Sequence, residues 1–227
     1  MKSRQEIKAL AKEAMKQQRG TSILLLLVLS LVTFASVALD MIVLLTLGMG
    51  VAYWVVYLVG LAVILVMAVN VLGEYIKVYK YEQAEVGALF SGLKVNFLRK
   101  LGGMLWMSLW VMLWSLLLVI PGIIKGLSYY FTANILADCP EVGAREALKL
   151  SMRITQGHKM DIFIFILSWI GWMMLSALTL GILYVVYVGP YWATSDAGLY
   201  LEMRKKAVAE GRIAPEEFGK TAAELGL

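Results

Sequence analysis

The basic residues of this chain are sorted into four segments that are separated by long apolar stretches. All but one of its 21 Lys and Arg residues lie in residues 2–19, 77–100, 145–159 and 204–220. The exception is Lys125. If each interval between these segments crosses a bilayer twice, all four share one face. Because Lys and Arg accumulate in cytoplasmic loops, the sorting predicts an integral membrane protein with six crossings and with both termini in the cytoplasm.

The composition supports a membrane protein rather than a soluble domain. Hydrophobic residues make up 60% of the chain, charged residues only 16%, and the mean hydropathy is +0.76. The apolar run at residues 21–72 is too long for one crossing, because a helix rises about 1.5 Å per residue and the hydrocarbon layer is about 30 Å thick. It must therefore fold back. The expected turn lies between residues 39 and 50, where Asp40, Gly48 and Gly50 interrupt the run.

We therefore expect an all-α membrane protein with six transmembrane helices and two cytoplasmic amphipathic helices. The second span is expected at residues 51–72, and the later ones at residues 101–120, 121–137, 161–178 and 182–203. The domain organisation follows from these spans. It comprises an N-terminal interfacial amphipathic helix (1–20), a six-helix transmembrane domain (21–203) with a cytoplasmic amphipathic helix near 143–157, and a cytoplasmic tail (204–227).

The N-terminal segment has the pattern of an amphipathic helix. Ser3 and Glu6 have the spacing of a capping box, and apolar residues recur at helical spacing opposite Lys8, Lys12 and Lys16. Such a helix buries its apolar face either at the headgroup boundary of a membrane or against cytoplasmic loops of the protein itself. The sequence leaves both arrangements open.

An internal repeat is a further prediction. The tetrapeptide Glu-Val-Gly-Ala occurs at residues 85–88 and again at residues 141–144. Each copy precedes a basic amphipathic stretch that is followed by two predicted spans. The N-terminal helix and the first two spans form a looser third copy of the same helix-plus-hairpin unit.

Polar residues at membrane depth are the first candidates for a functional role, because burying them in hydrocarbon costs free energy. The candidates are Asp40, Asn70, Lys125, Asn134 and Asp196. Lys125 and Asp40 either form an ion pair near the outer face or each reach headgroup level, and we favour the second arrangement. Asp196 either lines a solvated cavity or pairs near the inner interface on a kinked helix, and here too we favour the second.

Three residues are candidates for helix packing. Gly122 and Gly126 form a small-xxx-small pair, which lets the predicted fourth span approach another helix closely. Pro190 is expected to kink the last span and to free a backbone carbonyl one turn earlier.

No catalytic, cofactor-binding or metal site is expected. The only histidine is His158, and its spacing from Asp138, Cys139, Glu141 and Asp161 matches no zinc-ligand pattern. The sequence also contains no glycine-rich phosphate loop and no nucleophile elbow. The sequence pI near 9.2 reflects charges that follow the loops, so no nucleic-acid partner is expected. The expected partners are anionic lipid headgroups at the cytoplasmic face and another membrane protein.

The second half of the chain carries an ordered set of short motifs. They are IPGIIK at residues 120–125, ILAD at 135–138, GHK at 157–159, IGW at 170–172 and TLG at 179–181. In these motifs the chain resembles a family of bacterial membrane proteins known as domain of unknown function 975. Cys139 stands where that family usually has Asn, and Trp169 where it has Phe. The resemblance implies a multi-pass protein of the prokaryotic cell membrane and assigns no catalytic residues.

The function expected from these observations is that of a non-enzymatic structural or regulatory membrane component. It would contact lipids or partner proteins through its basic inner face. The alternative is a small-solute transporter or channel that uses the intramembrane polar residues Asp40, Lys125, Asn134 and Asp196.

Overall fold

The computed structural model describes residues 2–225 and is all-helical. About 80% of the chain is helix, and the described residues contain no strand. The elements in chain order are α1 (Arg4–Gln17), α2 (Arg19–Leu47), α3 (Val51–Tyr79), α4 (Ala88–Lys94), α5 (Phe97–Leu117), α6 (Val119–Ser128), α7 (Thr132–Asp138), α8 (Ala144–Thr155), α9 (Lys159–Leu167), α10 (Ile170–Leu178), the π-helix η1 (Tyr184–Val188), α11 (Gly189–Ala209) and the 3-10 helix η2 (Pro215–Phe218).

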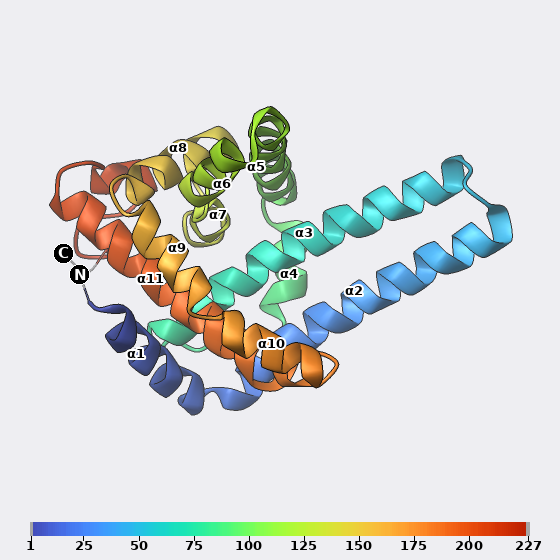
Figure 1. Cartoon of the computed structure of the whole chain (residues 1–227), viewed down its shortest axis with the longest axis horizontal. Coiled ribbons are helices and arrows are strands. Elements are labelled where there is room, and N and C mark those ends of the chain that lie inside the picture. The colour runs from blue at the N-terminus through green and yellow to red at the C-terminus, as the bar shows by residue number, and fades with distance from the viewer. Residues whose placement is uncertain (1, 226–227) are drawn as a thin grey trace.

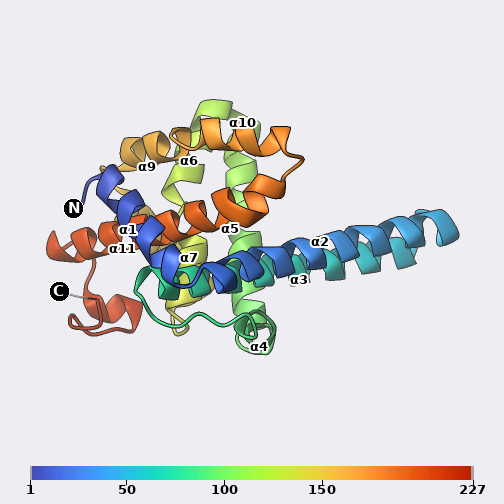
Figure 2. The ribbon, with the colours of Figure 1, turned by 90° about the horizontal axis from the view of Figure 1, so that it is seen from below.

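Helices α2 and α3 form a long hairpin that extends away from the rest of the molecule (Figure 1). The turn lies at residues 48–50, where Gly48 adopts a φ of +71° that favours glycine. The predicted turn region is therefore confirmed, but Asp40 does not interrupt the helix as expected, because α2 continues to Leu47. Both marked ends of the chain lie away from the hairpin tip (Figures 1 and 2).

Within the described residues, three helical segments are long and apolar enough to cross a membrane. They are α2, α3 and the segment Lys159–Leu178, which α9 and α10 form together. The first two match the predicted first and second spans, and the third matches the predicted fifth span. Their apolar side chains are largely exposed, as a lipid-facing surface requires.

The predicted fourth span is not one continuous helix. It is divided into α6 and α7. Side chains of α8 form hydrogen bonds with the backbone groups that the break leaves without helical partners. The Ser151 hydroxyl accepts from the Phe131 N–H at 3.2 Å and donates to the Ser128 carbonyl at 3.0 Å, and the Thr155 hydroxyl donates to the same carbonyl at 3.3 Å. Helix α8 therefore packs against the break with its apolar side buried.

The predicted sixth span corresponds to η1 and most of α11, and much of it is buried. Helix α11 contacts α1, α2, α3 and α8, and buried apolar side chains of α11, such as Leu199 and Met203, belong to the main hydrophobic core. Phe131 and Tyr200 pack within that core at a ring separation of 5.7 Å. The π-helical turn immediately precedes Pro190, which supplies no N–H for a regular helical bond.

Helix α1 shows the predicted capping box and an apolar side that packs on the protein. The Glu6 N–H donates to the Ser3 hydroxyl at 3.2 Å, and the Ser3 N–H donates to the Glu6 carboxylate at 2.7 Å. Ile7, Ala11 and Met15 are buried, and α1 contacts α11 and α3. The apolar face of α1 therefore packs on the protein itself, as in the second arrangement, but on the helices α11 and α3 and not on loops as that arrangement supposed.

Both Glu-Val-Gly-Ala copies end at the first residue of a helix. Gly87 is the N-cap of α4, and Gly143 is the N-cap of α8. The order of elements agrees with the predicted units, because α1, α4 and α8 each precede a pair of apolar helical arms. The two glycines have different backbone conformations, with ψ of −27° and 158° respectively, so the copies share their order but not their local geometry.

The α5–α6 hairpin points in a different direction from the α2–α3 hairpin. Figure 1 shows α5 nearly end-on while α2 and α3 run across the view, and Figure 2 shows α5 from the side. The turn between α5 and α6 lies at Leu118, slightly before Ile120 and Pro121, where the sequence predicted it. Residues on the outer sides of both helices, such as Met112 and Ile123, are exposed.

The two glycines of the small-xxx-small pair have different environments. A Cβ at Gly122 would meet the Ser115 hydroxyl and would lie 2.9 Å from the Ser115 Cα, so α6 contacts the α5 backbone here. A Cβ at Gly126 would meet nothing within 4 Å. The predicted packing role is therefore supported for Gly122 and is wrong for Gly126, because the pattern spans a turn of which only one end faces α5.

This difference predicts opposite effects of two alanine substitutions. Gly122→Ala forces α5 and α6 apart and is expected to destabilise the protein by about 1–3 kcal/mol. Gly126→Ala is expected to stabilise it by up to about 1 kcal/mol, because alanine loses less backbone entropy in a helix. Unfolding of the purified variants in detergent measures both. Equal effects of the two substitutions would contradict the assigned helix contact.

Candidate functional site

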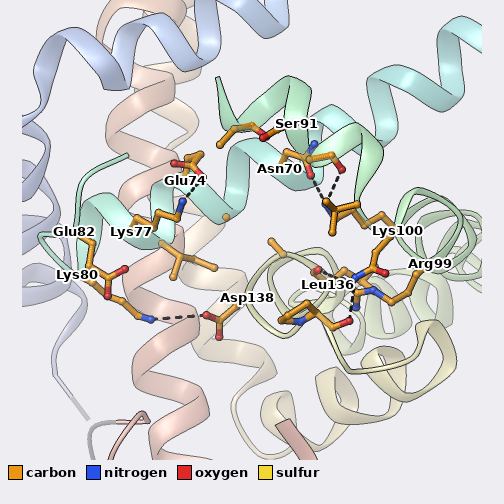
Figure 3. A pocket seen from close by; sticks show the side chains of 18 residues that line it. Asn70, Glu74, Lys77, Lys80, Glu82, Ser91, Arg99, Lys100, Leu136 and Asp138 are labelled. Atoms are coloured by element: carbon orange, nitrogen blue, oxygen red, sulfur yellow. Dashed lines mark hydrogen bonds and ion pairs between the residues drawn. The ribbon is translucent and has the colours of Figure 1, made fainter. Parts of the chain in front are cut away.

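A cavity lined by seven charged residues lies between α3, α4, α5 and α7 (Figure 3). Its volume is about 380 Å³. We call it the basic pocket. Its charged lining residues are the cations Lys77, Lys80, Arg99 and Lys100 and the acids Glu74, Glu82 and Asp138.

Lys100 is buried in the wall of the basic pocket without an acidic partner. Only 9% of the residue is exposed, and its ammonium donates to the Asn70 side-chain oxygen at 2.6 Å and to the Gly92 carbonyl at 3.1 Å. Gly92 permits this contact, because a Cβ there would lie 2.6 Å from the Asn70 amide nitrogen. Asn70 in turn donates to the Leu89 carbonyl at 2.9 Å, which joins α3 to α4.

Arg99 also lacks an acidic partner. Its guanidinium donates to the backbone carbonyls of Leu136 and Val142 at 2.6 Å each and to that of Cys139 at 3.1 Å. These carbonyls lie at or just beyond the C-terminal end of α7, which a cation stabilises. The Arg99 Nε has no hydrogen-bond partner within the described chain.

The two remaining cations of the basic pocket are paired with acids. Lys77 contacts Glu74 at 2.7 Å, and Lys80 lies 3.8 Å from Asp138. No carboxylate within the described residues lies at ion-pair distance from Arg99 or Lys100. Both precede the predicted third span, and burial lowers the pKa of the Lys100 ammonium, with a further contribution from the Arg99 charge. The negative charge of an anion in the basic pocket would oppose both effects on the pKa of Lys100.

Asp138 joins the basic pocket to α11 and to the C-terminal tail. Its carboxylate pairs with Arg204, accepts from Lys220 at 2.7 Å and from the Tyr200 hydroxyl at 3.2 Å, and lies 3.8 Å from Lys80. Burial alone would raise the pKa of Asp138, but the surrounding cations outweigh burial and hold it below its usual value. Within this cluster, Asp138 neutralises charges that would otherwise be buried without a partner.

Two of the predicted intramembrane candidates lie together. The Asn134 side chain donates to the Asp196 carboxylate at 3.1 Å, and both line a second cavity of about 310 Å³. Asp196 therefore has a polar side-chain partner and also lines a cavity, so the structure combines elements of both predicted arrangements.

Of the other three candidates, Asn70 contacts Lys100 in the wall of the basic pocket. Asp40 and Lys125 lie apart from the pair of Asn134 and Asp196 and from each other. Asp40 lines a separate cavity of about 340 Å³ between α2 and α3. The Lys125 ammonium lies over the Trp114 ring, 5.0 Å from its centroid. No ion pair joins Asp40 to Lys125 in the described part of the chain, so that alternative is wrong.

The residues considered for zinc binding do not converge. His158 contacts Asp161 at 2.9 Å, while Asp138 is occupied by the cations described above. Residues 2–225 hold no group of three His, Cys, Asp or Glu side chains placed to bind one metal ion.

Sequence reasoning did not single out Arg99 and Lys100 as pocket residues, because it counted them only among the charges of a basic segment. A signal was present, because these two adjacent cations directly precede an apolar stretch and are followed by Gly102 and Gly103. A Cβ at Gly103 would lie 2.5 Å from Leu136, so α5 approaches α7 closely beside the basic pocket.

Comparison with known proteins gives one match. Residues 55–207 match the model of a family described as "Protein of unknown function (DUF975)". The matched region contains every residue that lines the basic pocket. No curated protein and no solved structure matches the chain.

Proposed function

The chain belongs to this family of unknown function (DUF975), and on that premise we propose that it binds anionic phospholipid headgroups at the cytoplasmic face of a prokaryotic cell membrane. The observation that carries the proposal is the pair Arg99 and Lys100, which line one pocket and have no carboxylate partner. A phosphate would supply the missing negative charge. Arginine and lysine are the usual ligands of such groups.

The place of the basic pocket favours a lipid over a soluble anion. It lies beside the last turns of α3 and the first turns of α5, and each of these helices has a long apolar stretch on its other side. Such a position in a membrane protein lies at headgroup depth. Basic pockets between membrane helices bind the phosphates of anionic lipids.

The proposed topology has both termini in the cytoplasm and three apolar hairpins that enter the membrane from that side. The hairpins are α2–α3, α5–α6 and the arm formed by α9 and α10 with its return through η1. The sorting of Lys and Arg supports this orientation. The bound lipid would stabilise the packing of α3, α4, α5 and α7 against one another. This is a structural or regulatory role and involves no chemical reaction.

The headgroup proposal predicts a specific effect of Lys100→Met. With one of the two unpaired cations removed, retention of phosphatidylglycerol should weaken about tenfold, which corresponds to about 1.4 kcal/mol. Native mass spectrometry of the protein released from nanodiscs that contain phosphatidylglycerol and phosphatidylcholine measures the bound lipid.

The matched control is Lys94→Met, because Lys94 belongs to the same basic segment but is exposed and does not line the basic pocket. It should leave lipid retention unchanged. Inorganic phosphate added at millimolar concentration should not displace the lipid if the acyl chains contribute. Equal losses in both variants would show general surface attraction and would contradict a site at the basic pocket.

A small-solute transporter is the second candidate function. The observation that favours it is the contact between Asn134 and Asp196 beside a cavity. Asp40 and Lys125 do not contribute to that cavity, so a continuous polar path through all four residues has no support.

A further inference from the structure

The second cavity lies between α2, α3, α7, η1 and α11, and its walls are mostly apolar. Leu26, Leu29 and Val71 form part of one side, and Ala133 and Ala193 form part of the other. The volume of about 310 Å³ is within the range of small-molecule sites. We call it the Asp196 cavity. It shares no lining residue with the basic pocket.

One carboxylate oxygen of Asp196 has no partner. The residue is 7% exposed, Asn134 donates to Oδ2, and the Tyr130 hydroxyl is a further polar partner of the carboxyl group. Oδ1 accepts no hydrogen bond within the described chain. No Lys or Arg side chain in residues 2–225 forms an ion pair with it. An unpaired carboxylate in an apolar site carries a large desolvation cost, which a cationic ligand would offset.

The aromatic residues of the Asp196 cavity are also suited to binding a cationic ligand. Tyr130, Tyr184 and Trp192 all line it. The faces of such rings attract cations, and substituted ammonium groups are bound in this way because their methyl groups also fill apolar space. The cavity therefore combines one buried carboxyl group, aromatic rings and apolar walls.

The shape of the cavity wall depends on the π-helical turn. Tyr184 is the first residue of η1, and the Gly189 N–H donates to its carbonyl. A Cβ at Gly189 would lie 2.5 Å from the Leu26 Cδ1 and 2.8 Å from the Tyr184 carbonyl oxygen, so only glycine permits this approach. Turns of this kind occur frequently at functional sites.

We propose that the Asp196 cavity binds a small organic monocation, a substituted ammonium with apolar groups. The ammonium would lie at the free Oδ1 of Asp196, and its apolar groups would contact the aromatic walls. A bare metal ion fits less well, because hard divalent cations require about six oxygen ligands and the cavity offers few. The inference does not depend on lipid binding at the basic pocket.

Benzyltrimethylammonium is a suitable probe, and neopentylbenzene is its uncharged isostere. The full-length protein in phosphatidylcholine nanodiscs is titrated with each compound by calorimetry. The charged probe should bind at one site, and the uncharged isostere should bind at least about tenfold more weakly. Equal binding of the two compounds, or no binding of the charged probe, would overturn the proposal.

Asp196→Asn keeps the shape of the side chain and removes its charge, so it should weaken binding of the probe at least about tenfold. The matched control is Asp40→Asn, which removes a carboxylate from the separate cavity between α2 and α3 and should leave binding unchanged. Trp192→Leu should weaken binding by removing one aromatic wall. If Asp196→Asn binds the probe as well as the wild type does, Asp196 is not the counter-charge and the proposal fails.

Discussion

Replacing Asp138 with Asn is expected to lower the free energy of unfolding by about 3–5 kcal/mol, because it leaves a buried cation without its partner. That cation is Arg204, whose side chain is 2% exposed. Lys220 would lose its ion pair with the same carboxylate. Asparagine has nearly the same shape as aspartate, so the loss would come from charge and not from a cavity.

The expected loss of stability should affect one part of the structure before the others. Asp138 closes α7, and its two strongest partners lie on α11 and in the C-terminal tail. The tail also contacts α8, through the pair of Arg153 with Glu217. Loss of the Asp138 charge should therefore loosen the tail first, which limited proteolysis of the purified protein in detergent would detect.

Denaturant unfolding monitored by tryptophan fluorescence measures the stability change. The matched control is Glu210→Gln, because Glu210 pairs with Lys206 and Arg212 at the surface and its removal should change stability little. Because the pKa of Asp138 lies below its usual value, its stabilisation is present above the unfolded value of about 3.9. It should disappear as the pH falls through the lower folded value in the wild type and in Glu210→Gln, but not in Asp138→Asn, which lacks this carboxyl group. Equal stability of the two variants at neutral pH would contradict the role of the cluster.

Hydropathy and charge predicted the parts of the fold that are long and continuous. The α2–α3 hairpin follows from an apolar run longer than one crossing, together with the glycines at its turn. Local patterns also located the capping box of α1 and the start of α8, whereas the short helix α4 was not predicted. These features depend on residues that are close in the chain, which is why the sequence carries them.

The sequence did not show how the shorter elements divide and pack. The break between α6 and α7 exists because Ser151 and Thr155 of α8 satisfy its backbone groups, and that contact joins residues about 20 positions apart. Similarly, Gly122 and Gly126 look equivalent in the sequence, but only the contact with α5 distinguishes them. Packing partners outside the local pattern decide such cases.

The candidate sites could be predicted only in part, again because they depend on contacts between residues that are far apart in the sequence. Asn134 and Asp196 could be selected as polar residues in apolar segments, but their contact depends on the placement of α7 beside α11, which the sequence does not show. Arg99 and Lys100 were hidden in a basic segment, where a charge is ordinary. What distinguishes them is the absence of a carboxylate partner around the basic pocket, which only the fold reveals.

The proposed six-crossing topology predicts an all-or-none labelling result. Cysteines introduced for the exposed residues Met49, Ile120 and Leu178, at the tips of the three hairpins, should react with a membrane-impermeant maleimide in intact cells. Cysteines introduced for the exposed residues Lys149 and Glu216 should react only after permeabilisation. The sorting of Lys and Arg is the physical basis of this expectation.

The native thiol does not interfere with this experiment. Cys139 is fully buried, and burial raises the pKa of its thiol to about 11, so little reactive thiolate is present at neutral pH. The wild-type protein should therefore remain unlabelled before and after permeabilisation. That result is the internal control for each introduced cysteine.

Ile120 is the most informative of the five positions, because the α5–α6 hairpin points away from the direction of α2 and α3 (Figure 2). Two hairpins cross one bilayer together only if both tips reach the far side. External labelling at Ile120 would require α5 and α6 to align with α2 and α3 in the membrane. Labelling there only after permeabilisation would reduce the crossings to four, and the basic pocket would then lie above a hairpin that rests on the inner leaflet.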